Sequence, residues 1–516
     1  MSTEGSENPG GDPPPPSPPL RGAAIRGARL ALIGWGSSQA LIFVGYLVLA
    51  RLVDPSDFGR FAAASLIIGV GGLFAESGMM AALINRRDRI EEAASTAFFS
   101  LLLGGTLLTL MSLAASPLLG LFFRSGRVTA LSAALSGWLL LRALTVVPDA
   151  LLQRHMSYAR RVAVDPLGAI AFTGTSIAVC SGGAGAWGLV AGTYASMLVQ
   201  LVTAWLFLGE RPRRSLASVA MWRELGGYAR PVIGSEILRR IAGQLDVVML
   251  GRFHSAASLG QYRNGVRLAQ QPTNAFVDVG AYVLLPTLAR LQGEPARLQA
   301  SARRVFETSL TGSIPVSLAM IPLGVPIALL CLGDRWREAG LAIAGFSGVL
   351  IGVSLNSIAS EILKAVGLPG RLMRIHGFGL VVTAVLVCAA AIPFGVLGVA
   401  IAISVSQLVI GLFAFSLVSP LIEMSGRALA AAAVRPLLAG ALMLTAMVSF
   451  ALLERPATRG QASGLALIVA EVLLGLLTYV SALAAIDPAW RRALMFAVAR
   501  GARRIRPGIQ TADRSG

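Results

Sequence analysis

The sequence predicts an all-α polytopic membrane protein. Of its 516 residues, 55% are hydrophobic and 14% are charged, whereas ordinary soluble domains carry about 25% charged residues. The mean hydropathy is +0.70. Apolar segments follow one another along the chain, and the polar gaps between them are too short for a soluble catalytic domain. We therefore expect a bundle of transmembrane helices, and we do not expect an enzyme.

The apolar segments are long enough to cross a bilayer, since a spanning helix needs roughly 20 apolar residues. Their number predicts about fourteen transmembrane helices. They cover residues 30–50, 60–84, 96–122, 128–149, 163–181, 187–208, 229–250, 264–288, 306–331, 340–363, 373–393, 396–419, 433–453 and 463–486.

The basic residues orient these helices. The net charge of +18 could indicate nucleic-acid binding, but the arginines are spread over many loops and form no compact basic face. Thirty basic residues lie in alternate inter-helix segments and the two ends of the chain, against ten in the other loops. Basic residues concentrate on the cytoplasmic side of membrane proteins. We therefore expect an even number of spans, with both termini in the cytoplasm and no nucleic-acid partner.

The two halves of the chain resemble each other. Residues 50–61 and 251–262 share an arginine, an apolar residue before a glycine, and an aromatic residue at the same spacing. Glu76 and Asp278 also correspond at nearly the same offset. Because six predicted helices separate the two copies, the halves run in the same direction, which is typical of a parallel repeat about an axis along the membrane normal.

This repeat and the composition divide the chain into six parts. The first twenty residues are rich in proline, glycine and serine, which predicts disorder. We expect a disordered cytoplasmic tail (1–24), an N-terminal six-helix lobe (25–210), a cytoplasmic linker (211–228), a C-terminal six-helix lobe (229–420), two additional transmembrane helices (421–490) and a basic cytoplasmic tail (491–516).

Charged residues at bilayer depth mark the candidate site, because such residues usually face a bundle interior or an aqueous cavity. In the span over 229–250, Glu236, Arg239, Arg240 and Asp246 lie within one half of the helix surface. Two alternatives stay open for this segment. Glu236 and Arg240 are spaced to neutralise each other, or the segment begins as an interfacial helix.

The next span carries a second polar stripe, formed by Arg267, Gln271, Asn274 and Asp278. In the second span of the chain, Ser65, Gly69, Gly72 and Glu76 repeat that spacing with small residues, which also favours close helix packing. We expect the cavity to bind an anionic substrate, because arginine pairs with phosphate in a fork geometry. The predicted substrate-binding residues are Arg142, Arg239, Arg240, Arg267, Gln271 and Asn274.

Acidic side chains in the same cavity suit a coupling cation, either H⁺ or Na⁺. The predicted ion-coupling residues are Glu76, Glu236, Asp246 and Asp278. We expect no cofactor and no metal site, since the three cysteines lie far apart in apolar segments and the chain has no GxxxxGK[ST] phosphate-binding motif.

Several short segments carry a family resemblance. Residues 49–64, 74–78 and 82–88 resemble the opening of Wzx-type oligosaccharide flippases, which belong to the multidrug/oligosaccharidyl-lipid/polysaccharide (MOP) exporter superfamily. The segments 244–246, 250–251, 260–262 and 267–268 are similar to the matching part of the second half. By its order of spans, the resemblance covers roughly residues 25–490.

This resemblance implies two six-helix lobes around a central cavity, often followed by two extra helices. It implies a polyprenyl-pyrophosphate-linked sugar as cargo, moved from the cytoplasmic to the outer leaflet of a bacterial inner membrane, with other polysaccharide-assembly membrane proteins as partners. Two other functions stay open: a cation-coupled multidrug antiporter of the same superfamily, and a membrane scaffold of polysaccharide assembly that transports nothing.

Overall fold

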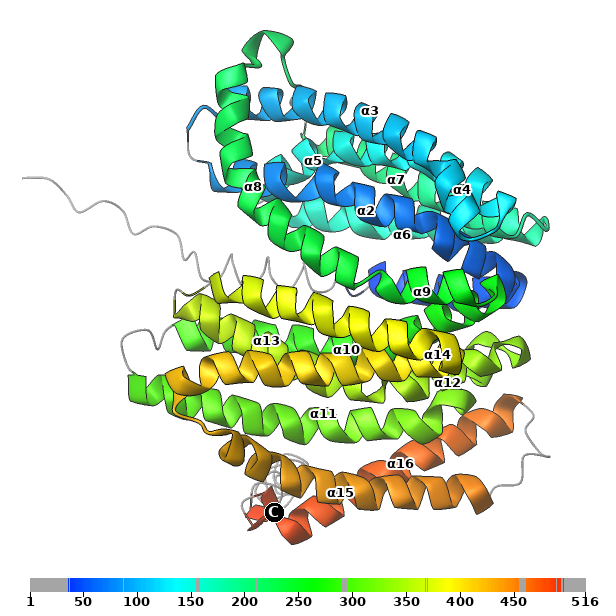
Figure 1. The fold of residues 1–516 in the computed structure, drawn as a ribbon, viewed down its shortest axis with the longest axis vertical. Coiled ribbons are helices and arrows are strands. Elements are labelled where there is room, and N and C mark those ends of the chain that lie inside the picture. Colours follow the sequence, from blue (N-terminus) through cyan, green and yellow to red (C-terminus); the bar gives the residue numbers. More distant parts are fainter. Residues whose placement is uncertain are drawn as a thin grey trace, which may run out of the picture.

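The computed structural model describes residues 36–495, apart from 37, 87, 155–157, 209–210, 290–294, 367, 369, 454–460, 489 and 493–494. The described residues form helices and turns and contain no β-strand. The helices lie side by side as a bundle (Figure 1). They are a first helix Ser38–Leu52, α2 Pro55–Asn85, α3 Ile90–Phe122, α4 Gly126–Ser136, α5 Trp138–Arg154, α6 Tyr158–Ser181, α7 Ala186–Leu208, α8 Val219–Ala242, α9 Leu245–Phe253, α10 Ala256–Ala289, α11 Pro295–Leu332, α12 Arg337–Gly345, α13 Val349–Ala365, α14 Gly370–Ile422, α15 Gly426–Leu453 and α16 Gln461–Ile486.

The expected all-α membrane fold is confirmed. Among the described residues, nine helical segments are long and apolar enough to cross a membrane. Two of these segments each contain a pair of consecutive helices, α4 with α5 and α12 with α13. Helix α14 contains two helices joined at Gly395, whose φ of 55° and ψ of −137° break the helical path just after Pro393. The order of helices is consistent with the predicted fourteen spans.

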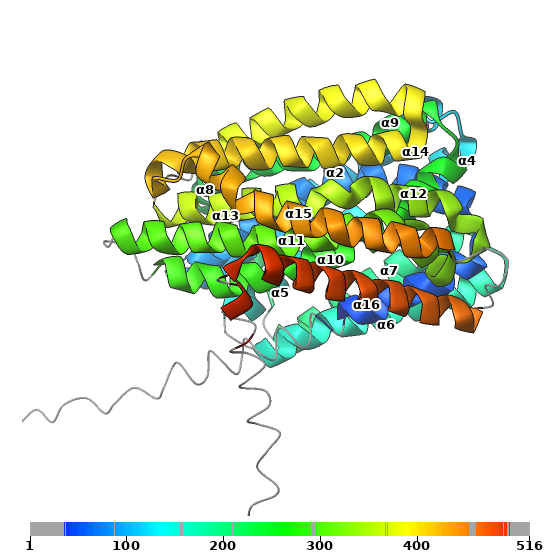
Figure 2. The ribbon, with the colours of Figure 1, turned by 90° about the horizontal axis from the view of Figure 1, so that it is seen from below.

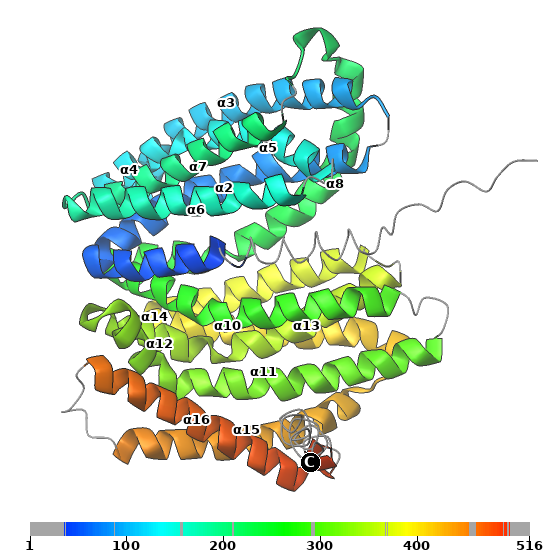
Figure 3. The ribbon, with the colours of Figure 1, turned by 180° about the vertical axis from the view of Figure 1, so that it is seen from behind.

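The helices form two groups that follow the chain. Helices α2 to α7 gather at one side of the bundle, and α10 to α14 at the other (Figures 1 and 3). Helices α15 and α16 pack against each other and against α11, on the outside of the second group (Figure 2). This arrangement is consistent with the predicted lobes and two additional helices. Helix α8 begins at Val219, inside the segment predicted as a linker, so the extended connection ends earlier than expected.

The two groups meet where α2 and α10 begin. A Cβ atom on Gly59 would overlap the carbonyl oxygen of Ala256, and a Cβ atom on Gly260 would overlap that of Pro55. Each glycine therefore admits the backbone of the other helix. These reciprocal contacts join residues that correspond in the predicted repeat, as expected if its pseudo-two-fold axis passes between the two glycines.

More contacts close this end of the bundle, which we call the hairpin end because it holds the turns before α2, α10 and α12. The Trp336 side chain is fully buried, and its indole N–H donates to the carbonyl oxygen of Ala50 at 2.8 Å. The Trp336 ring packs edge-on against Phe58, with 5.5 Å between ring centroids. Arg335 forms an ion pair with Asp54 at 2.8 Å. The opposite end, with residues 211–218, we call the linker end.

Candidate functional site: a cationic cavity beside helix α2

Helix α2 presents its stripe of small residues to the second half of the chain. A Cβ atom on Gly69 would lie 3.1 Å from the Gln244 side chain, and one on Gly72 would lie 3.8 Å from the Arg240 guanidinium. Ser65, on the same stripe, lines a cavity shared with α10. The small residues thus leave room for Gln244, which lies between α8 and α9, and for basic side chains of α8 and α10. The Glu76 side chain, next on the stripe, lies outside the described part of the structure.

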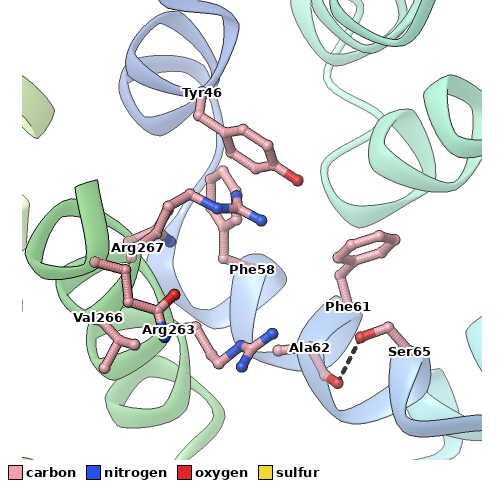
Figure 4. Close-up of a pocket in the computed structure, with 10 residues that line it drawn as sticks. Tyr46, Phe58, Phe61, Ala62, Ser65, Arg263, Val266 and Arg267 are labelled. Carbon is pink, nitrogen blue, oxygen red and sulfur yellow. Dashed lines mark hydrogen bonds between the residues drawn. The ribbon is translucent and has the colours of Figure 1, made fainter. Parts of the chain in front are cut away.

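Arg267 enters the cavity between α2 and α10. Its guanidinium carbon lies 3.3 Å from the centroid of the Tyr46 ring, well within the range of a cation–π contact. The cavity has a volume of about 110 Å³ and is also lined by Phe58, Phe61 and Arg263 (Figure 4). The aromatic rings hold the guanidinium without neutralising it, because a ring carries no net charge.

Arg263 is not among the predicted site residues, because it lies just before the predicted span over 264–288. It lies one helical turn before Arg267 on α10 and lines the same cavity (Figure 4). No described carboxylate forms an ion pair with Arg263 or Arg267. Two like charges one turn apart repel each other by a few tenths of a kcal/mol, and an anion between them would relieve that repulsion. Extending the stripe from Arg267 back by four residues would have found Arg263.

Arg240 approaches the same helix from α8. Its Nη1 atom donates to the carbonyl oxygen of Gly69 at 3.4 Å. Its position beside Gly72 puts a third guanidinium along α2, on the linker-end side of the Arg267 cavity. The side chains of its predicted neighbours Glu236 and Arg239 lie outside the described residues, so the predicted pairing of Glu236 with Arg240 stays a prediction.

Arg142 lies in a separate cavity within the first group of helices. Its guanidinium forms an ion pair with Asp149 at 3.6 Å. This cavity measures about 380 Å³ and is also lined by Asp165, Trp138 and Phe172. The Phe172 ring lies 5.5 Å from that of Tyr46, so these two rings separate the Arg142 and Arg267 cavities. Asp149 and Asp165 were not predicted, and the structure favours internal neutralisation for Arg142.

The predicted amides on α10 differ from the residues found in the cavity. Gln271 and Asn274 are exposed, and the Gln271 side chain donates back to the carbonyl oxygen of Arg267 at 3.3 Å. Gln270 lines the cavity instead. Both glutamines lie near Arg267 on a helical wheel, so spacing alone could not choose between them. The Asp278 side chain lies outside the described residues.

Asp246 is buried and hydrogen-bonded. The Tyr262 hydroxyl donates to one of its carboxylate oxygens at 2.8 Å, and the backbone N–H of Val247 donates to the other at 2.8 Å. These bonds fix α9 to the start of α10, directly after the break between α8 and α9. Among the described residues, no group of three metal-ligating side chains lies close enough to hold a metal ion.

A family model describing polysaccharide biosynthesis proteins matches residues 48–340. The chain belongs to this family. The matched range includes the reciprocal glycine contact, the Arg267 cavity, Arg240 and Arg142, so all the described arginines of the site lie within the region that defines the family.

Two curated relatives are similar to this chain. The succinoglycan biosynthesis transport protein ExoT of Rhizobium meliloti is 24% identical over 60% of this chain and 63% of its own length. The lipopolysaccharide biosynthesis protein WzxC of Escherichia coli is 23% identical over 62% of this chain and 65% of its own length. The similarity therefore spans somewhat less than two thirds of each relative.

Solved structures share the fold. The lipid II flippase MurJ, in an inward closed conformation, superposes with a TM-score of 0.74 over 90% of this chain and 99% of its own, at 13% identity. An inward-facing multidrug resistance transporter of the MATE family and MOP superfamily gives a TM-score of 0.54 over 78% of this chain, at 18% identity. The chain thus shares its fold with these two solved structures, and its long apolar helices make it a multi-pass membrane protein.

Proposed function

We propose that this protein flips a polyprenyl-pyrophosphate-linked oligosaccharide from the cytoplasmic to the outer leaflet of a bacterial inner membrane, for the synthesis of a surface polysaccharide. One observation carries the proposal: Arg263 and Arg267 line one cavity, and neither forms an ion pair with a described carboxylate, although Asp246 lies near enough to Arg263 to interact with it electrostatically. Arg240 of α8 lies beside the same helix α2, farther from the hairpin end. The names of the relatives, which refer to succinoglycan and lipopolysaccharide biosynthesis, support polysaccharide as the cargo.

The chemistry of the cargo fits these side chains. A pyrophosphate linkage carries negative charge, and arginine pairs with phosphate oxygens through two parallel hydrogen bonds while staying charged when partly desolvated. The cavity volume of about 110 Å³ suits a phosphate group but not a whole lipid-linked sugar. Cargo entry therefore requires the two groups of helices to separate along α2 and α10.

Transport follows by alternating access. Contacts at the hairpin end, such as Arg335 with Asp54, join the two groups of helices, and we assign this end to the outer side because the basic residues concentrate at the other. Both termini then lie in the cytoplasm, which reporter fusions at Ser6 and after Arg504 can check. Coupling to H⁺ or Na⁺ would use Glu76, Glu236, Asp246 and Asp278.

Reconstituted vesicles test the proposal. Purified protein should move a fluorescent polyprenyl-pyrophosphate sugar between leaflets, and should leave a lipophilic cationic dye in place. Movement of the dye alone would instead establish the multidrug antiporter. Movement of neither, from vesicles in which the protein is folded and correctly inserted, would favour the non-transporting scaffold and overturn the proposal.

A further inference from the structure

A second cavity opens at the linker end, away from the Arg267 cavity. It has a volume of about 490 Å³ and lies between the start of α3, the end of α5, the end of α7 and residues 211–216. Because α3 begins there at Ile90 and α7 ends there at Leu208, the cavity lies at the level where spanning helices meet the lipid headgroups.

The walls of this cavity combine apolar and charged side chains. Leu151 and Leu208 line its apolar part, together with Trp205. The Trp205 ring of α7 packs edge-on against Phe98 of α3, with 5.5 Å between ring centroids. This contact closes the wedge-shaped space between α3 and α7 on one side of the cavity. The Trp205 indole N–H donates to the carbonyl oxygen of Leu144 at 3.2 Å. Tryptophan in this position is typical of a membrane–water interface.

The charged side chains are two arginines and one glutamate. Arg211, Arg213 and Glu91 all line the cavity and are exposed. Among the described residues, none of the three forms an ion pair. Two cations and one anion at the mouth of an apolar wedge match a molecule with an acyl chain, a phosphodiester and an ammonium group.

The backbone around these residues is held in place. The backbone N–H of Arg213 donates to the Ser95 hydroxyl at 3.1 Å, and that of Ser218 donates to the Thr96 hydroxyl at 3.1 Å. The Ser218 hydroxyl donates to the Glu92 carboxylate at 2.9 Å. Three hydrogen bonds thus fix residues 211–218 across the start of α3, so the arginines are presented by an ordered segment.

We propose that this cavity binds the headgroup of an aminophospholipid with a primary ammonium, such as phosphatidylethanolamine. Arg211 and Arg213 bind the phosphodiester, Glu91 accepts hydrogen bonds from the ammonium, and the acyl chains lie against Leu151 and Leu208. The bound lipid then tethers the segment that joins the two groups of helices. This site is separate from the proposed cargo cavity, and its test does not depend on transport.

Native mass spectrometry on detergent-purified protein measures lipid retention directly. We expect the protein to retain phosphatidylethanolamine over phosphatidylcholine with the same acyl chains, because a methylated ammonium cannot donate hydrogen bonds to Glu91. The double variant R211Q/R213Q should weaken retention at least about tenfold, since the phosphodiester loses both of its charge-assisted hydrogen-bond donors. The variant E91Q should lose the preference for phosphatidylethanolamine over phosphatidylcholine.

Two further variants complete the test. R214Q/R223Q removes the same charge from neighbouring positions that do not line the cavity and should change retention less than twofold. L216W should fill the cavity and displace the lipid without removing charge. Equal retention by R211Q/R213Q and R214Q/R223Q would overturn the proposal. Displacement of the lipid by an equal concentration of water-soluble phosphoethanolamine would also overturn it, because a soluble anion would then be the ligand.

Discussion

At the residue scale, the surroundings of each arginine determine what it can do. Arg267 stacks on Tyr46 and shares its cavity with Arg263, whereas Arg142 forms an ion pair with Asp149. A charge at bilayer depth costs about 2.5–3.5 kcal/mol on insertion scales. For Arg142 the carboxylate offsets that cost, while for the pair on α10 an incoming anion can do so.

The variants R263Q and R267Q test the anion site. Each variant removes one charge with a modest change in side-chain volume, so we expect normal amounts of protein in the membrane. Transport of the lipid-pyrophosphate should fall at least about tenfold, because a hydrogen bond to a charged group contributes about 1.5–3 kcal/mol. Vesicle transport, normalised to the amount of inserted protein, measures this. R127Q, an exposed arginine at the hairpin end, is the control. Full transport by the double variant R263Q/R267Q would refute the assignment.

The Arg142–Asp149 pair should behave differently. R142Q removes a cationic partner of the buried Asp149 carboxylate, and breaking a buried ion pair by removing one partner destabilises a folded protein by about 3–5 kcal/mol. We expect a lower thermal unfolding midpoint in detergent and nearly unchanged transport by the folded fraction. The double variant R142Q/D149N should recover most of the midpoint. If R142Q instead unfolds normally and fails to transport, Arg142 contacts the cargo.

At the element scale, the crossing of α2 and α10 joins the two halves. Gly59 and Gly260 each admit a carbonyl oxygen of the other helix, so the two backbones come closer than any side chain would allow. The small residues Gly69 and Gly72 continue along α2 and make room for Gln244 and Arg240. Helix α2 therefore supplies both the joint between the halves and one wall of the candidate site.

The variants G59A and G260A test this joint. Each added methyl group would overlap a backbone carbonyl of the partner helix, which cannot rotate away, so we expect a destabilisation of about 1–3 kcal/mol. G104A in α3 is a matched control, since a Cβ atom there meets nothing within 4 Å and alanine stabilises a helix interior by about 0.5–1 kcal/mol relative to glycine. Thermal unfolding in detergent compares the three. Equal midpoints for G59A and G104A would contradict the close crossing.

At the scale of the whole molecule, the halves are joined at the hairpin end. Between α11 and α12, Trp336 donates a hydrogen bond to Ala50 at the end of the first helix, and Arg335 pairs with Asp54 just before α2. Alternating access requires these contacts to break when the cavity faces outward. The ion pair of Asp54 with Arg335 is exposed, and exposed pairs contribute about 0–1 kcal/mol, so it can open readily.

Crosslinking tests this motion. In a background with the three native cysteines replaced, D54C/R335C joined by a short cleavable bis-thiol reagent should hold the hairpin end closed. We expect transport to stop and to return when the reagent is cleaved. Each single cysteine variant, treated in the same way, is the control. Undiminished transport by fully crosslinked protein would show that the hairpin end need not open.

The sequence alone determined the fold class. The length of an apolar segment decides whether a helix can cross the bilayer, and the distribution of arginines between loops decides its orientation, and neither depends on tertiary packing. The sequence also placed Arg267 in a polar stripe and matched Gly59 with Gly260. Only the tertiary structure decided that Arg263 and Tyr46 join Arg267, that Gln270 and not Gln271 lines the cavity, and that Asp149 pairs with Arg142. The physical reason is that spacing fixes the face of one helix on which a side chain lies, whereas the side chain it meets depends on how distant helices pack.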